Sequence, residues 1–533
     1  MIQSASSLLF NRSGPACEFR KKFFKTFGVE QVVNLSALRF RVFNKRKGSA
    51  QKAVAPACVV VFGPEAPKGD RVLYLSPKLA EDHTDEFDIL VEPQDIKEVH
   101  QDDGAIDPEV WTAHMWGNRR DWTFIKRLRR CLCLEQFRKE KVVDIQEGLI
   151  PSETGDLHEG TVGRRFLDAD TFPPGTFLYL DAPKIPSTDG LCTHRETDLA
   201  AFDLPQLVVK QGWQEATRRF QAALTRASGS LGILATQSYL SAHTPIKHVV
   251  VLEAACLSYN SILAVYFLLL TSSRFASYRP EPLVGELRRV PIPKPEAGLL
   301  QHLTTHAELD ARVRQAFGFK DAEWVLVEDL FNITLPDRKG DEASPGRLRT
   351  DRIEKSLEEP QLRQYCEYFI RVLKAGFGRD KQISATIFQE KSSDLLPFRL
   401  VAFRFDQAAT PSVQVESLDT PNLLAELETL NKTWLKSRKA KNGDVYHQRT
   451  ARIYDRRGGA PTVFILKPDA CRYWTRSMGL HDADEVAADF FSWQTDAGNK
   501  NQGILFEGMR FGKGTESDQE PKPSSANKHG RPA

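Results

Sequence analysis

Two clusters of basic residues carry the clearest chemistry in this sequence. Residues 1–60 contain eleven lysines and arginines against two acids, Glu18 and Glu30, in a 533-residue chain whose net charge is only +3. Such a cluster favours a polyanionic partner, with an affinity that falls as the salt concentration rises. It also suits a face that is simply solvated, and charge alone leaves both interpretations open. Its members are Arg12, Arg20, Lys21, Lys22, Lys25, Arg39, Arg41, Lys45, Arg46, Lys47 and Lys52.

The second basic cluster surrounds Trp116 and Trp122. The apolar residues between Asp121 and Leu134 follow the spacing of an amphipathic helix, for which Asp121 is the expected N-cap. This cluster could contact a DNA backbone, or it could be the solvated face of a helix that covers a tryptophan-based core. Its basic residues are Arg119, Arg120, Lys126, Arg127, Arg129 and Arg130.

Three groupings resemble metal or nuclease sites, but each is better explained otherwise. His302 and His306 are four residues apart, but a hydrolytic zinc helix needs a glutamate after the first histidine, where this chain has a leucine. The acids after His481 suit the start of a helix through its dipole. Asp469 and Glu485 have no lysine at the spacing of a nuclease pair. We therefore expect no metal site.

The cysteines and the apolar runs bear on the compartment. The eight cysteines are scattered without a Cys-x-x-Cys pair, and no secretory leader is recognisable. The longest apolar run, residues 262–270, is far shorter than the roughly 20 residues that cross a bilayer. We expect reduced thiols, no membrane partner and a cytoplasmic protein.

The elements that must position these residues fall into several units. At the start we expect a strand at 7–10, a helix at 17–27, a strand at 29–35, an exposed loop at 36–55, and a hairpin formed by strands 57–62 and 71–75. The predicted units are residues 1–100, a basic helical connector at 101–145, a β-rich unit at 146–300, a helical linker at 301–346, a small α/β domain at 347–495 and a mostly disordered tail at 496–533.

Two blocks of sequence carry a resemblance to a known family. The first is Val-Val-Asn-Leu-Ser-Ala-Leu-Arg-Phe-Arg-Val-Phe, ending at Phe43, followed at a distance by Pro-Ala-Cys-Val-Val-Val from Pro56. The second is the basic, β-rich unit that ends with the Asn260-Ser261 helix and a Val-Pro-Ile-Pro segment at 290–293. Together, and in this order, the blocks resemble the adenine-specific (N6) DNA methyltransferases of the type IIG restriction–modification kind, over roughly residues 5–295.

The resemblance implies an α/β fold in three parts. These are the rear half of a Rossmann-like methyltransferase sheet, a mixed α+β target-recognition domain, and an additional small α/β C-terminal domain that has no family assignment. A complete enzyme needs a Gly-rich turn for the methyl donor and an (Asn/Asp/Ser)-Pro-Pro-(Tyr/Phe) corner for the target amine. The chain has neither, since its Pro173-Pro174 follows Phe172. We expect no catalytic residue in this chain, and S-adenosylmethionine binding only when a partner subunit supplies the front half.

The same resemblance suggests which residues meet DNA. Such enzymes flip the target base and hold it between apolar surfaces, and the family position of one wall corresponds here to Phe43, with Phe40 as its neighbour. Phe43 could instead pack under its own loop. Arginine and glutamine suit guanine and adenine edges, and the cations suit phosphates. The candidates for DNA contact are Arg39, Arg41, Lys45, Arg46, Lys47, Arg119, Arg120, Arg164, Arg165, Lys210, Gln211, Arg218, Arg219, Gln237 and Arg274.

The function expected from the resemblance is DNA binding and target recognition within an adenine-N6 DNA methyltransferase of a restriction–modification or phage-defence system. Its partners would be double-stranded DNA and a subunit carrying the front half of the catalytic domain. The alternative is a catalytically inactive DNA-binding or scaffold protein derived from such an enzyme. A longer natural protein, with a different start, is a third interpretation.

Overall fold

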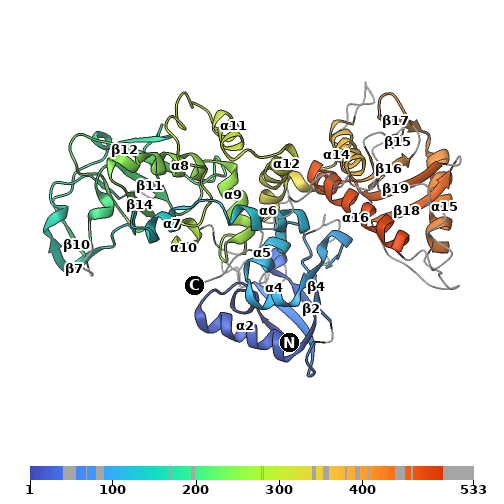
Figure 1. Cartoon of the computed structure of the whole chain (residues 1–533), viewed down its shortest axis with the longest axis horizontal. Helices are drawn as coiled ribbons and strands as arrows, with labels where there is room; N and C mark the ends of the chain where they lie inside the picture. Colours follow the sequence, from blue (N-terminus) through green and yellow to red (C-terminus); the bar gives the residue numbers. More distant parts are fainter. Residues whose placement is uncertain are drawn as a thin grey trace, which may run out of the picture.

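The fold is mixed α/β, which confirms the class predicted from the sequence. Three five-stranded sheets each combine parallel and antiparallel neighbours. Figure 1 shows them in three regions, with the first (residues 1–139) at the bottom, the second (144–338) at the left and the third (344–495) at the right. The computed structural model describes residues 1–39, 56–67, 69–79, 89–168, 171–193, 198–277, 279, 281–338, 344–351, 359–378, 381–390, 396–405, 408–437, 450–457 and 460–495.

The sheet of the first region has the strand order β1-β3-β2-β4-β5. β2 runs parallel to β4, and β1 and β2 are both antiparallel to β3, so β1, β2 and β4 point the same way. Their carboxyl ends therefore lie at one edge of the sheet. The elements are β1 (Ile2–Ser4), α1 (Ala5–Leu8), α2 (Gly14–Thr26), β2 (Gly28–Asn34), η1 (Ser36–Leu38), β3 (Ala57–Gly63), β4 (Arg71–Leu75), η2 (Pro93–Asp95) and β5 (Ile96–His100).

Three local predictions for the first region are wrong. Residues 7–10 are not a strand, because α1 begins at Ala5 and turns Leu8 and Phe10 into the core. β3 and β4 do not form a hairpin, since β2 lies between them. Asp121 is not an N-cap. It lies one turn into its helix, where its carboxylate accepts the backbone N–H of the true N-cap, Asn118.

Short helices connect the first sheet to the second region. Asn118 and Asp121 form a capping box, which satisfies N–H groups that a helix start leaves unpaired. Trp111 is fully buried and donates its indole N–H to the backbone oxygen of Gly104, 3.0 Å away. The connecting helices are α4 (Gln101–Ile106), α5 (Glu109–Trp116), α6 (Arg119–Leu128) and α7 (Leu134–Lys139).

The second region is built on the strand order β6-β14-β11-β12-β9, with two small two-stranded sheets beside it. Its strands are β6 (Asp144–Glu147), β7 (Pro151–His158), β8 (Phe166–Leu167), β9 (Tyr179–Asp181), β10 (Leu191–Thr193), β11 (Gln206–Lys210), β12 (Ala222–Arg226), β13 (Leu234–Ala235) and β14 (Tyr239–His243). Its helices are α8 (Val249–Tyr259), α9 (Ile262–Thr271), α10 (Val284–Leu287), α11 (His306–Phe317), α12 (Asp321–Asp329), the π-helix η7 (Leu330–Thr334) and α13 (Leu335–Asp337).

One hydrophobic core runs through the first and second regions. All ten residues of α9 are buried, nine of them in this core, and each fully buried Leu, Ile or Phe contributes about 1.5–3 kcal/mol. The core extends from Ala5 to Leu335, so the units predicted at 1–100, 101–145, 146–300 and 301–346 share it, and it also includes Tyr368 and Leu480 of the third region. The arrangement of the two regions is therefore fixed by packing rather than by a linker.

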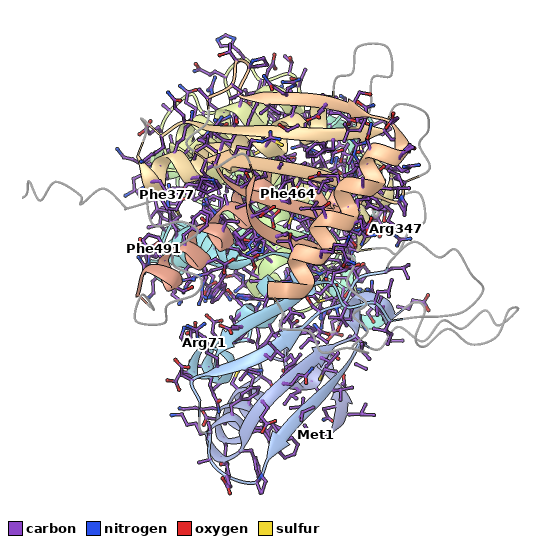
Figure 2. The ribbon with its side chains drawn as sticks, turned by 90° about the vertical axis from the view of Figure 1, so that its right-hand side faces the viewer. Met1, Arg71, Arg347, Phe377, Phe464 and Phe491 are labelled. Carbon is purple, nitrogen blue, oxygen red and sulfur yellow. The ribbon has the colours of Figure 1, made fainter. Side chains whose placement is uncertain are left out.

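The third region has its own core on each face of a sheet ordered β17-β15-β16-β19-β18. α14 and α16 cover one face, while Leu423 and Leu430 of α15 cover the other. Figure 2 shows this region above the first, with Phe464 on its sheet. Its elements are η8 (Pro345–Arg347), α14 (Pro360–Phe377), β15 (Ile383–Glu390), β16 (Phe398–Phe405), β17 (Val413–Leu418), α15 (Thr420–Ser437), β18 (Ala451–Arg457), β19 (Ala460–Pro468), η9 (Cys471–Tyr473) and α16 (Arg476–Thr495).

The expected absence of a membrane span can be compared with the helices of the described chain. In the part of the chain that the structure describes, no single helix is long and apolar enough to cross a membrane. The segments Ile246–Tyr259 and Ile262–Thr271 pass a test of length and composition only as a pair, with a 75° bend between them. The tail predicted at 496–533 lies outside the described residues.

Candidate functional site

The carboxyl edge of the first sheet is where the regions meet. Open α/β sheets bind ligands beyond the carboxyl ends of their parallel strands. Asn34 ends β2 there, and its side-chain amide donates to the Tyr74 hydroxyl at 2.7 Å while its oxygen accepts the Ser36 N–H at 3.0 Å. The described chain leaves this edge at Arg39 and returns at Pro56. The loop predicted to hold the flipped base is therefore attached here.

Arg39 joins this edge to the second region. Its buried guanidinium donates to the Ser36 oxygen at 3.1 Å and the Arg338 oxygen at 3.5 Å. Burial, and secondarily the charge of Arg338, lowers the pKa of Arg39 to about 9. Arg338 in turn donates to the backbone oxygens of Phe275 and Arg279, at 2.6 and 2.8 Å. Arg39 thus supports the base of the loop.

Several predicted DNA-contacting residues of the second region gather around these contacts. The Arg338 guanidinium lies over the rings of Trp213 and Phe275, 5.9 and 4.6 Å from their centroids. Trp213 follows Lys210 and Gln211 at the end of β11, and Arg274 precedes Phe275. Arg39 and Arg274 adjoin this contact directly or through a sequence neighbour, while Lys210 and Gln211 lie at the end of β11 and Arg218, Arg219 and Gln237 in the turns before β12 and β14.

The members of this group differ in what their side chains already contact. The side chains of Lys210 and Arg274 have no hydrogen bond or ion pair with any described group. Gln211 donates to Glu147 at 3.0 Å and to the Gln237 oxygen at 2.8 Å. The Arg218 guanidinium lies 5.2 Å from the Phe331 ring centroid. Lys210 and Arg274 are therefore the side chains most available to a phosphate.

Other candidates support the fold in this conformation. Arg164 is buried and donates to the Phe202 oxygen at 2.6 Å. Arg219 forms a bidentate pair with Asp310, at 2.9 and 2.5 Å, and donates to the Asn260 oxygen at 3.1 Å.

Arg165 and the two arginines that open α6 lie elsewhere. Arg120 pairs with Asp484 of α16, with one contact at 2.6 Å. Arg165 is exposed and donates to the Ile185 oxygen at 2.9 Å. Arg119 is exposed and has no side-chain partner in the described chain. The remaining candidates, Phe40, Phe43, Arg41, Lys45, Arg46 and Lys47, lie outside the described residues.

In both basic clusters some cations form ion pairs or are buried, while others are exposed. Arg12 pairs with Glu109 at 3.1 Å, and Arg20 is buried, donating to the Leu8 oxygen at 3.1 Å. The exposed cations of α2 are Lys21, Lys22 and Lys25. In the second cluster Arg127 and Arg129 form ion pairs, while Lys126 lies 5.4 Å from the Trp122 ring centroid.

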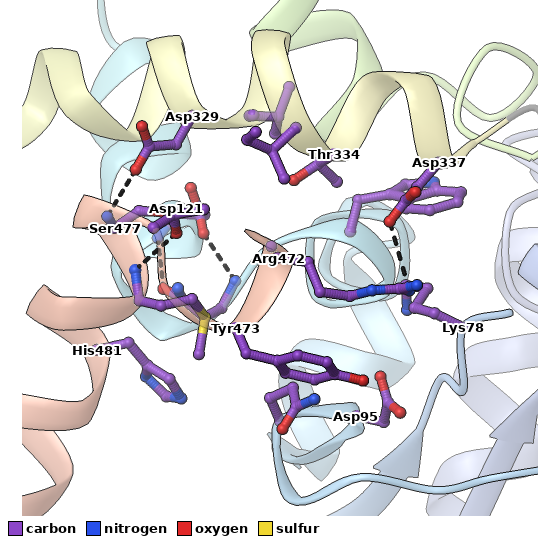
Figure 3. A pocket seen from close by; sticks show the side chains of 18 of the residues that line it. Lys78, Asp95, Asp121, Asp329, Thr334, Asp337, Arg472, Tyr473, Ser477 and His481 are labelled. Atoms are coloured by element: carbon purple, nitrogen blue, oxygen red, sulfur yellow. Dashed lines mark hydrogen bonds and ion pairs between the residues drawn. The ribbon is translucent and has the colours of Figure 1, made fainter. Parts of the chain in front are cut away.

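A pocket of about 120 Å³ lies at the carboxyl edge, between all three regions. Figure 3 shows its charged side chains converging from the end of β4, from α6, from α12 to α13, and from η9 and α16. Its apolar wall includes Met115, Trp116, Leu330, Tyr473 and Met478. A ligand here would touch every region of the chain.

Two lysines in this pocket approach the same hydroxyl group. Lys78 Nζ is 3.1 Å and Lys97 Nζ 3.3 Å from Ser76 Oγ, and Lys97 also donates to the His114 oxygen at 2.5 Å. Burial lowers the pKa of Lys78 to about 8 and, together with the charge of Lys78, that of Lys97 to about 7. Neither ammonium forms an ion pair with any described carboxylate. Lys78 lies 5.3 Å from the Trp116 ring centroid.

The acids of the pocket wall are mostly held by other groups. Asp121 accepts from the Tyr266 hydroxyl at 2.8 Å, and Asp337 lies 3.4 Å from Arg472. Asp329 accepts from Arg476 and from the Ser477 N–H, both at 2.7 Å. Burial raises the pKa of Asp95, although both pocket lysines act in the opposite direction. The lysines are thus the cations of the pocket that lack a direct counter-ion among the described groups.

The sequence analysis did not find this pocket. Lys78 and Lys97 lie in ordinary strand-end segments, and their convergence depends on the pairing of β4 with β5. In the described chain no group of three or more His, Cys, Asp or Glu side chains could hold a metal ion. No family model matches the chain, and no curated sequence matches it significantly. The function must therefore be argued from the site itself.

Proposed function

We propose that this chain is the DNA-binding and target-recognition part of an adenine-N6 DNA methyltransferase of the type IIG kind, acting in a restriction–modification or phage-defence system. A partner subunit would supply S-adenosylmethionine binding and the catalytic corner. The observation that carries the proposal is the contact of Arg39, at the carboxyl edge of the first sheet, with Arg338. The Arg338 guanidinium lies over Trp213 and Phe275, in the two segments that carry the predicted DNA-binding residues Lys210 and Arg274.

The topology of the first region supports the sheet part of the proposal. β1, α2 and β2 form a strand–helix–strand unit whose two strands run the same way, and β3 lies between them in the opposite direction. This order of elements agrees with the closing half of a Rossmann-like sheet. The second region, whose sheet carries the free cation Lys210, would then be the target-recognition domain.

The edge of the sheet at β1 supports the partner subunit. β1 pairs only with β3 among the described strands, so its other side is open. Ile2 on this strand is 78% exposed. Open strand edges are templates for pairing with another chain. A front half that adds its strands at β1 would bring the donor site beside the loop attached at Arg39.

The test is methyl transfer from labelled S-adenosylmethionine to mixed-sequence duplex DNA. It would use this chain alone and with the product of the neighbouring gene. We expect incorporation only when both are present. Salt-sensitive DNA retention without incorporation in either tube would support the alternative, an inactive DNA-binding protein. Absence of DNA retention at low salt would overturn both.

A further inference from the structure

The pocket that contains Lys78 and Lys97 has no part in the proposed methyl transfer. The front half would join at β1, whereas the pocket lies beside β4 and β5, at the opposite end of the sheet. Neighbouring strands are about 4.8 Å apart, so β1 and β5 are separated by roughly 19 Å. The pocket is therefore distant from the strand at which the front half would join, although it lies at the same carboxyl edge as the Arg39–Arg338 contact.

The two lysines indicate an anionic ligand group. Their ammonium groups converge on Ser76 Oγ without an ion pair to any described carboxylate. Both ammonium groups are hydrogen-bonded, Lys78 to the Ser76 backbone oxygen and Lys97 to the His114 oxygen, but these neutral acceptors leave both charges without a counter-ion among the described groups. Charge-assisted hydrogen bonds to an anion are stronger than those to neutral groups. Phosphate carries two negative charges near neutral pH and three acceptor oxygens, so it can satisfy both ammonium groups and the serine hydroxyl together.

The rest of the pocket wall indicates a ligand that contains an aromatic ring. Trp116 and Tyr473 offer aromatic surface, and Gln94, Asn118 and Thr334 offer polar groups beside it. A volume of 120 Å³ corresponds to roughly ten waters, or on the order of 300 Å³ of liquid. That is room for a single nucleotide-sized molecule and excludes duplex DNA.

We propose that this pocket binds a small organic phosphate with an aromatic ring, of the nucleoside monophosphate class. The phosphate contacts Lys78, Lys97 and Ser76, and the ring lies against Trp116 and Tyr473. Because Tyr473 and Arg472 come from the third region, the ligand also holds that region against the first. This assigns a role to the C-terminal region, for which the sequence offered none.

The experiment is calorimetric titration of the full chain with adenosine, guanosine, cytidine and uridine monophosphates, with the nucleosides, and with inorganic phosphate. At least one monophosphate should bind in the micromolar range. Its nucleoside should bind at least tenfold more weakly, and inorganic phosphate should compete for the site. Absence of binding by every monophosphate at millimolar concentration would overturn the proposal, as would equal binding by a nucleoside.

Three variants locate the site. Lys78→Met and Lys97→Met keep the length of the side chain and remove a partly buried charge, so they should fold and should weaken monophosphate binding at least tenfold. Lys126→Met alters an exposed lysine of α6 outside the pocket and should bind as the wild type does. The assignment would be contradicted if all three variants lowered monophosphate affinity equally, or if none of them lowered it. Unchanged DNA retention by Lys97→Met would separate this site from the DNA-binding role.

Proton linkage gives an independent readout. The groups facing Lys97 are Lys78, Asp95 and Asp121, together with His114, whose pKa burial lowers to about 4 so that it stays neutral above pH 7. Since the pKa of Lys97 is about 7, binding near neutral pH should take up a proton. Monophosphate affinity should fall between pH 7 and 9 in the wild type and fall less in Lys97→Met. An affinity independent of pH would count against contact with Lys97.

Discussion

At the scale of single residues, the structure separates cations that are free from cations that hold the fold. Charge composition cannot make this distinction, because Arg219 and Lys210 are equivalent in a count of basic residues. The Arg219 guanidinium contacts Asp310 and a backbone oxygen, whereas the Lys210 ammonium has neither an ion pair nor a hydrogen bond with any described group. Only a few of the predicted DNA-binding residues therefore have side chains available for a phosphate.

This difference predicts opposite phenotypes for two alanine variants. Lys210→Ala should weaken DNA retention without changing stability, and should reduce the slope of log affinity against log salt by about 1. Arg219→Ala should destabilise the chain by about 3–5 kcal/mol, since it leaves the mostly buried Asp310 carboxylate unpaired. Filter retention at several salt concentrations and urea unfolding measure the two effects. An unchanged salt slope for Lys210→Ala would remove Lys210 from the interface.

At the scale of elements, the sequence predicted the regular elements well where local periodicity decides them. The helices α2 and α9 and the strands β2, β3 and β4 lie close to their predicted positions. Pairing was less accessible, because adjacency along the chain wrongly suggested a β3–β4 hairpin. The pocket could not be predicted from the sequence because strand pairing is not determined by adjacency along the chain. It is formed by residues that only strand pairing and the packing of the third region bring together.

Close packing between α14 and α16 gives a prediction for one glycine. A Cβ on Gly479 would lie 2.4 Å from the Tyr365 backbone oxygen, so the two helices touch through the missing side chain. Gly479→Ala should push α16 away from α14 and destabilise the third region by about 1–3 kcal/mol. It should also disturb the hydrogen bond from the Tyr365 hydroxyl to Asp482.

Thermal unfolding monitored by near-ultraviolet circular dichroism would measure the effect. Gly14→Ala is the matched control, since a Cβ on Gly14 would meet no atom within 4 Å. The control should leave the unfolding midpoint unchanged or raise it slightly, because alanine favours the helix. A similar unfolding midpoint for both variants would mean that α16 can move away from α14 without a loss of stability.

At the scale of the whole molecule, the third region is attached differently from the second. The first and second regions share one core, to which the third contributes only Tyr368 and Leu480 among the described buried residues; the third also has cores of its own and meets the others through several charged groups. Asp329 at the end of α12 is central to this contact. Its carboxylate accepts from Arg476 and from the Ser477 N–H in the first turn of α16, where a helix leaves N–H groups unpaired. Figure 3 shows the contact between Asp329 and Ser477 in the wall of the pocket.

Asp329→Asn should therefore loosen the third region without unfolding it. Asparagine keeps the shape of the side chain but removes the charge, which weakens docking by about 2 kcal/mol. Hydrogen exchange should increase in α12 and in the first turns of α16, while β16 in the core of the third region stays protected. Asp484→Asn is the control, because its pair with Arg120 involves a carboxylate that is 44% exposed and should be worth no more than about 1 kcal/mol. Equal exchange in the two variants would show that Asp329 is not the main attachment.

If the pocket is formed jointly by the two regions, Asp329→Asn should also weaken monophosphate binding, and saturating monophosphate should restore part of the lost protection from hydrogen exchange.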